Sequence, residues 1–171
     1  MSDNEFIIRP EMRDPDVQSR GQGMPKERLA SIKKGLHALH TLELMATNIY
    51  KFQLTRKPSE LNRQLAAAMC NEMTHYQDFQ TKLYEYGFKP SKLRGLYWMV
   101  GFVLGFGSRL LGPKVMLKVG IWVETKAVHH YKELLETVDW DDETRKIVEK
   151  DRDDEFRHIH QWEEDLAIGL K

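Results

Sequence analysis

Residues 143–168 read ETRKIVEKDRDDEFRHIHQWEEDLAI, and this stretch decides the fold class. Steps of three and four along it connect Val148, Asp151, Glu155, His158, Trp162 and Leu166. Because such steps place side chains on one face of an α-helix, the stretch predicts a helix with a buried stripe. Apolar residues at both ends of the stripe enclose three polar ones, which is unusual for a face that packs into a core.

Three other segments repeat this spacing, and each carries polar residues within its apolar stripe. The interruptions are Glu43 in the segment 26–55, Glu72 and His75 in the segment that follows Ser59, and Glu124 in the segment that starts at Pro113. The sequence therefore predicts four long helices, each with at least one carboxylate on its buried face.

The links between these helices predict their arrangement. The first and second helices, and likewise the third and fourth, are joined by short connections, whereas about 25 residues separate the second from the third, enough to cross a bundle from end to end. The apolar stretch 93–111 within this link favours an amphipathic helix. We expect an all-α fold, a ferritin-like antiparallel four-helix bundle with one long crossover that carries an apolar amphipathic helix. The bundle should comprise residues 26–171, preceded by a flexible N-terminal arm, residues 1–25.

Composition excludes several classes of protein. The 171 residues, 41% of them hydrophobic, suffice for one domain, and the 26 basic and 26 acidic side chains cancel. A net charge of zero gives no support for nucleic-acid binding. The single cysteine, Cys70, excludes an internal disulfide and a multi-thiolate metal site. We expect no signal peptide, and no transmembrane helix because the most apolar run, 96–107, is shorter than the roughly 20 residues that span a bilayer.

The polar residues on the four stripes form a pattern typical of a two-metal site. Each Glu-x-x-His pair can direct an oxygen and a nitrogen at one point, because residues three apart share a helix face. The other two helices each add one glutamate, which gives the candidate metal ligands Glu43, Glu72, His75, Glu124, Glu155 and His158. Four buried carboxylates need positive charge, which two divalent cations would supply. This ligand set favours two iron ions, with manganese as the alternative. The other interpretation is that the carboxylates lie at solvated helix edges and pair with lysine or arginine.

Four more polar residues are candidates for supporting the ligands. Asp151 would either orient a metal-bound imidazole from a neighbouring helix or lie at a solvated edge. His130 and Tyr131 follow Glu124 by six and seven residues, so we expect both beside the metals, as catalytic residues that do not ligate them. His40 would either donate a hydrogen bond to a ligand or be an ordinary packed histidine.

Two sequence motifs add to the ligand pattern: LYWMVGFVLGFG at residues 96–107 and VETKAVHHY at residues 123–131. With the ligands, they make the chain resemble the demethoxyubiquinone hydroxylases of ubiquinone biosynthesis over about residues 30–165. The chain departs from the usual family sequence at residues 39–46, LHTLELMA, and at Thr125, where the family carries a second glutamate.

The resemblance implies a di-iron monooxygenase that hydroxylates the ring of a polyprenyl benzoquinol. It implies dioxygen and a lipophilic quinol as reactants, NADH as an electron donor, and a peripheral membrane protein, for which residues 93–111 would make the contact. We expect the protein at the cytoplasmic face of a membrane, and a homo-oligomer remains open. The resemblance also implies roles for the ligands: Glu43 and Glu124 terminal, Glu72 and Glu155 bridging, His75 and His158 supplying imidazole.

Two other functions remain open at this point. A ferritin-like ferroxidase or iron-handling bundle would use the same ligands without an organic substrate, and it would not need the apolar crossover. A metal-free bundle that binds lipid or a partner helix would explain the crossover, but it would leave the buried carboxylates unexplained.

Overall fold

A computed structural model describes residues 17–170, and this part of the chain contains five α-helices and no strand. The helices are α1 (Lys26–Gln53), α2 (Glu60–Glu85), α3 (Arg94–Leu111), α4 (Pro113–Thr137) and α5 (Asp142–Ala167). The predicted all-α helical bundle is therefore confirmed.

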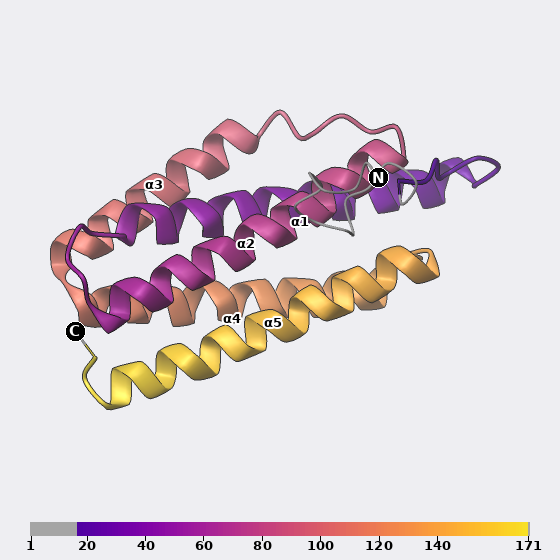
Figure 1. The fold of residues 1–171 in the computed structure, drawn as a ribbon. Helices are drawn as coiled ribbons and strands as arrows, with labels where there is room; N and C mark the ends of the chain where they lie inside the picture. The colour runs from indigo at the N-terminus through magenta and orange to yellow at the C-terminus, as the bar shows by residue number, and fades with distance from the viewer. Residues whose placement is uncertain (1–16, 171) are drawn as a thin grey trace, which may run out of the picture.

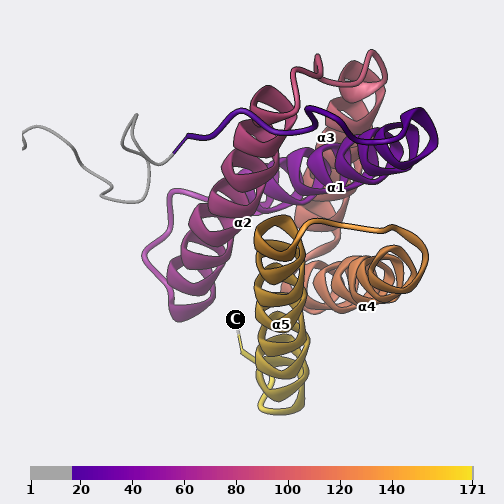
Figure 2. The same cartoon turned by 90° about the vertical axis from the view of Figure 1, so that its right-hand side faces the viewer.

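Two antiparallel helix pairs make up the bundle. Helix α1 runs against α2 and α4 runs against α5, while α3 carries the chain back along the bundle before α4 begins (Figure 1). Seen along the bundle, the two pairs lie one above the other and α3 lies outside them, next to α1 (Figure 2). Because of the long return through α3, α1 and α4 run in opposite directions.

Helix ends follow from local sequence. Ser59 and Asp141 cap α2 and α5, since their side chains accept hydrogen bonds from the backbone N–H groups three residues later. Gly87, with φ of 70°, lets the chain reverse after α2. Gly112, with φ of 97°, separates α3 from α4, and Pro113 occupies the first turn of α4, where its missing N–H costs nothing.

Part of the expected N-terminal arm is attached to the bundle. The Arg20 backbone N–H donates to the Glu85 carbonyl over 2.7 Å, and its guanidinium reaches Glu85 Oε2 at 2.5 Å and Asp141 Oδ1 at 2.9 Å. Residues 17–25 are thus held to the ends of α2 and α5 by ion pairs that the hydropathy pattern does not reveal. Residues 1–16 of the predicted arm lie outside the described residues.

The core contains three apolar clusters, and a polar layer separates the two larger ones. One cluster includes Leu36, Phe79 and Val148, and the other includes Leu65 and Trp162. The six candidate ligands lie between the two clusters along the helices. This arrangement places the polar residues near the middle of the bundle, far from its solvated ends.

Helix α3 packs closely on α1 through small residues. A Cβ atom on Gly101 would lie 2.6 Å from the Met45 carbonyl oxygen, and one on Gly105 would lie 2.4 Å from that of Ile49. The other face of α3 leaves large apolar side chains exposed, including Leu96 and Val103. Among the described residues, no helix combines the length and the apolar character that crossing a membrane requires.

This close approach predicts that Gly105→Ala destabilises the protein. The added methyl group would force α3 away from α1, at a cost of about 1–3 kcal/mol in the free energy of unfolding, which chemical denaturation would measure. Gly107→Ala is the matched control, because a Cβ there meets no atom within 4 Å. In a helix this control should stabilise the protein by about 0.5–1 kcal/mol. Equal stability of the two variants would contradict the close packing.

Candidate metal centre

The six predicted ligands come together from four helices. Glu43 is 1% exposed, and Glu72, His75, Glu124 and Glu155 are fully buried. Their donor atoms form two groups: Glu43, Glu72, His75 and Glu155 in one, and Glu72, Glu124, Glu155 and His158 in the other. Within each group, one donor atom from every residue lies within 4.8 Å of the others.

Glu72 and Glu155 belong to both groups. His75 Nδ1 lies 3.1 Å from Glu155 Oε1 and 3.8 Å from Glu72 Oε2. On the other side, His158 Nδ1 lies 3.0 Å from Glu72 Oε1 and 3.3 Å from Glu155 Oε2. The two carboxylates therefore lie between two imidazoles, in position to be shared by two cations.

Several donor atoms in the cluster lie close to one another but make no well-directed hydrogen bond within the protein. Five buried atoms share this property: both carboxylate oxygens of Glu72, Oε2 of Glu124, Oε2 of Glu155 and Nδ1 of His158. Buried polar atoms are normally satisfied, so five such atoms at one place indicate a missing partner. Since they are lone-pair donors, the partner they fit is a cation. The absence of thiolate from the set favours iron or manganese over thiolate-seeking metals.

Burial controls the ionisation of the cluster. It raises the pKa of Glu43 and of Glu124 well above the ordinary value, and the charges of neighbouring glutamates raise both further. For Glu72, burial acts in the same direction but is outweighed by His158 and His75, which lower the pKa of this carboxyl. The protein alone thus holds protons that bound cations would displace.

The outer nitrogen of His75 faces two aspartates of α5. His75 Nε2 lies 3.2 Å from Asp154 Oδ2 and 3.8 Å from Asp151 Oδ1. An acceptor at this nitrogen fixes the ring orientation and leaves Nδ1 free to ligate. The sequence indicated Asp151 for this position but missed Asp154, which lies one turn further along the same helix, three residues on.

Two tyrosines connect the opposite helices of the centre. The Tyr131 hydroxyl of α4 donates to Glu43 Oε1 of α1 over 2.5 Å, and the Tyr50 hydroxyl of α1 donates to Glu124 Oε1 of α4. Each tyrosine follows the glutamate of its own helix by seven residues, and because α1 and α4 are antiparallel, each reaches the other helix's glutamate. The sequence placed Tyr131 beside the centre but did not indicate Tyr50.

The remaining candidates lie away from the cluster. The His130 side chain is 36% exposed, and its Nδ1 lies 3.4 Å from Glu133. This position does not support a catalytic role beside the metals, because residue 130 falls beside the buried stripe of α4 and not on it. His40 is buried with its ring tilted against that of Tyr76, and its Nε2 lies 2.8 Å from Gln80 Oε1, so it is a packed histidine with a partner outside the ligand set.

Comparison with known proteins gives one family and several relatives. The family model described as "Ubiquinone biosynthesis protein COQ7" matches residues 30–167. A mitochondrial NADPH-dependent 3-demethoxyubiquinone 3-hydroxylase of Dictyostelium discoideum is 31% identical over 137 residues, which cover 75% of this chain and 62% of that protein. A 3-demethoxyubiquinol 3-hydroxylase of Legionella pneumophila (strain Lens) is 29% identical over 171 residues, covering 96% and 80%. A mitochondrial human protein with the same name as the Dictyostelium one is 26% identical, covering 85% of this chain and 71% of the relative.

Proposed function

The chain belongs to the COQ7 family of ubiquinone biosynthesis proteins, and on that basis we propose that it hydroxylates the ring of a demethoxyubiquinol-type polyprenyl benzoquinol. The single observation that carries this proposal is the buried cluster in which two carboxylates are shared between two sets of ligands. Four buried carboxylates are costly unless cations neutralise them. Their retention in the core is therefore explained by metal chemistry and not by folding.

We assign the ligands according to the two groups. Glu43 and His75 would hold one iron, Glu124 and His158 the other, and Glu72 and Glu155 would bridge them. Manganese remains the alternative metal. A bound pair of iron ions would supply the redox chemistry and the reaction with dioxygen, which no side chain of the protein can provide. Hydroxylation of a ring C–H bond places one oxygen atom on the ring and releases the other as water, with electrons and protons from a reductant.

The protein's own residues position and protect this chemistry. Tyr131 and Tyr50 keep their protons, because burial raises the pKa of both phenols, and so remain hydrogen-bond donors to Glu43 and Glu124. Trp162 Nε1–H donates to the Tyr50 hydroxyl over 3.0 Å and fixes that phenol in turn. The apolar clusters on either side exclude water from the ligands.

We propose a reduced nicotinamide as the electron donor. The sequence resemblance suggested NADH, whereas the Dictyostelium and human relatives are named NADPH-dependent. The described part of the chain consists of helices without any strand, and it therefore contains no βαβ dinucleotide-binding unit. Electrons would therefore reach the centre without a Rossmann-type site in this part of the chain.

We also propose peripheral contact with a membrane at its cytoplasmic face, through residues 93–111. On α3, Leu110 and Leu111 are 71% and 72% exposed, and the basic residues Arg94 and Arg109 lie near the two ends of the helix. An apolar face with basic ends is typical of a helix that lies in the membrane interface. The prenyl tail of a quinol would lie along this face.

Quinone analysis of cells tests the reaction. In a strain that lacks its own demethoxyubiquinol hydroxylase, expression of this protein should convert at least about half of the accumulated demethoxy quinone to its hydroxylated product or to ubiquinone, as measured by mass spectrometry. Glu155→Gln should leave the demethoxy quinone unchanged, whereas the exposed Glu164→Gln should behave like the parent protein. An unchanged quinone pool with well-expressed parent protein would contradict the proposal, and iron oxidation by that protein would then favour the ferroxidase.

A further inference from the structure

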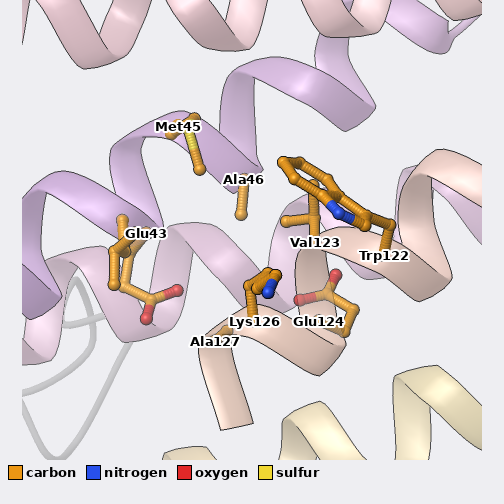
Figure 3. A pocket seen from close by; sticks show the side chains of 9 residues that line it. Glu43, Met45, Ala46, Trp122, Val123, Glu124, Lys126 and Ala127 are labelled. Atoms are coloured by element: carbon orange, nitrogen blue, oxygen red, sulfur yellow. The ribbon is translucent and has the colours of Figure 1, made fainter. Parts of the chain in front are cut away.

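A small pocket opens between α1 and α4 and ends at the candidate metal centre (Figure 3). Its volume is about 50 Å³, and Glu43 and Glu124 form part of its wall. In Figure 3 the carboxylates of these two residues point toward one another, with Ala46 of α1 and Val123 of α4 above them. The pocket therefore reaches the centre at the two glutamates that belong to different ligand groups.

The lining of the pocket is apolar apart from these carboxylates and Lys126. Ala46 and Ala127 are buried, and they keep the space between the two helices open because their side chains are short. Trp122, a residue that is 53% exposed, and the exposed Lys126 lie on the solvent side. The pocket is thus a short apolar passage from the surface of the bundle to the buried carboxylates.

The volume decides which reactant fits. Pockets that bind organic ligands typically measure about 300–1,000 Å³, so this pocket is too small for a substituted benzoquinol ring. Apolar cavities stay dry and take up apolar molecules such as xenon. Three larger pockets, of about 370, 430 and 710 Å³, include none of the six ligands in their walls. Of the reactants in the proposed hydroxylation, dioxygen alone matches both the size and the lining of the small pocket.

We propose that the pocket between α1 and α4 is the site through which dioxygen reaches the metal centre. Ala46 and Ala127 determine its width, and Trp122 covers its outer end. This inference rests on the proposed hydroxylation, since it supplies the route for one of the two substrates. Dioxygen would then enter on the α1–α4 side of the centre, whereas the quinol tail would bind along α3.

Xenon binding tests the site without any turnover. In crystals of the full chain under xenon pressure, anomalous diffraction should show xenon beside Ala46 and Ala127 in the parent protein. Ala46→Leu should abolish this xenon peak, because the larger side chain fills the pocket. The matched control is Ala67→Leu, at an exposed position of α2, which should retain the peak. If Ala46→Leu does not fold, Ala127→Val narrows the same passage with a smaller addition.

Kinetics of the iron-loaded enzyme then separate the two substrates. We expect Ala46→Leu or Ala127→Val to raise KM for dioxygen roughly tenfold, while KM for the quinol changes less than about twofold. Absence of xenon from the parent pocket would overturn the proposal. A rise in KM for the quinol alone would likewise overturn it, because it would make the pocket an entry for the ring. Since the xenon experiment needs no quinol and no iron, failure of the proposed hydroxylation would be recognised independently of the pocket.

Discussion

Glu155→Gln is expected to remove both metal ions from the protein. Glu155 contributes donor atoms to both ligand groups, so its loss weakens both positions at once. After reconstitution under anaerobic conditions, we expect the parent protein to hold about two iron ions per chain and the variant to hold close to none, by elemental mass spectrometry. Turnover should fall by more than about 100-fold, because loss of a shared ligand should cost more than loss of a supporting hydrogen bond.

The same substitution should not unfold the protein. Burial is the largest cause that raises the pKa of Glu124, and the negative charge of Glu155 is the second. Ionised together in the metal-free protein, the two carboxylates would repel each other. Glutamine preserves the size of the side chain, and it removes both this repulsion and the attraction between Glu155 and the protonated His158, so the metal-free variant should stay folded and melt close to the temperature of the metal-free parent. Glu164→Gln, at an exposed position of the same helix, is the control for both measurements. Full iron occupancy in Glu155→Gln would contradict its assignment as a bridge.

Metal binding is expected to stabilise the protein strongly and in a pH-dependent way. At a free metal concentration of about 100 Kd, binding contributes about 2.7 kcal/mol, which raises Tm by about 5–10 °C in a chain of this size. Because burial raises the pKa of Glu43 and Glu124, the cations must displace protons from these carboxyls. The metal-induced rise in Tm should therefore be larger at about pH 8 than at about pH 6.

The metal-free protein should respond to pH in the opposite direction. Burial lowers the pKa of His158, but Glu155 and Glu72 outweigh this effect and raise the pKa from 6.5 to about 10, so the imidazole keeps its proton. The folded protein then keeps a proton that the unfolded chain releases, so its contribution to stability is complete below pH 6.5 and is lost as the pH rises toward about 10. Calorimetry with and without metal at several pH values measures both trends. A metal-induced Tm rise that does not increase with pH would contradict the displacement of protons.

The sequence predicted the helices and the ligand set because both depend on one local rule. Steps of three and four residues define a helix face, and polar residues such as Glu43 and Glu124 are conspicuous on a face that is otherwise apolar. The two Glu-x-x-His pairs are also local, since their members share one helix. The structure then shows that the four faces meet, which the periodicity of any single helix cannot establish.

Contacts between helices were harder to predict from the sequence. Tyr50 reaches Glu124, and Asp154 reaches His75, only because separate helices are placed at a particular register. The seven-residue spacing from Glu43 to Tyr50, equal to that from Glu124 to Tyr131, is the signal that would have indicated Tyr50. The partly exposed position of His130 shows the converse limit: a residue adjacent in sequence to a buried tyrosine points to another side of the helix.

The most direct test of the metal centre is a crystal structure of the anaerobically iron-loaded full chain, with anomalous data collected at the iron absorption edge. We predict two iron peaks per chain, roughly 3.5–4 Å apart. Glu43 and His75 should contact one peak, Glu124 and His158 the other, and Glu72 and Glu155 both. A crystal in which these six residues bind no iron, or in which iron lies only on the surface of the bundle, would contradict the account.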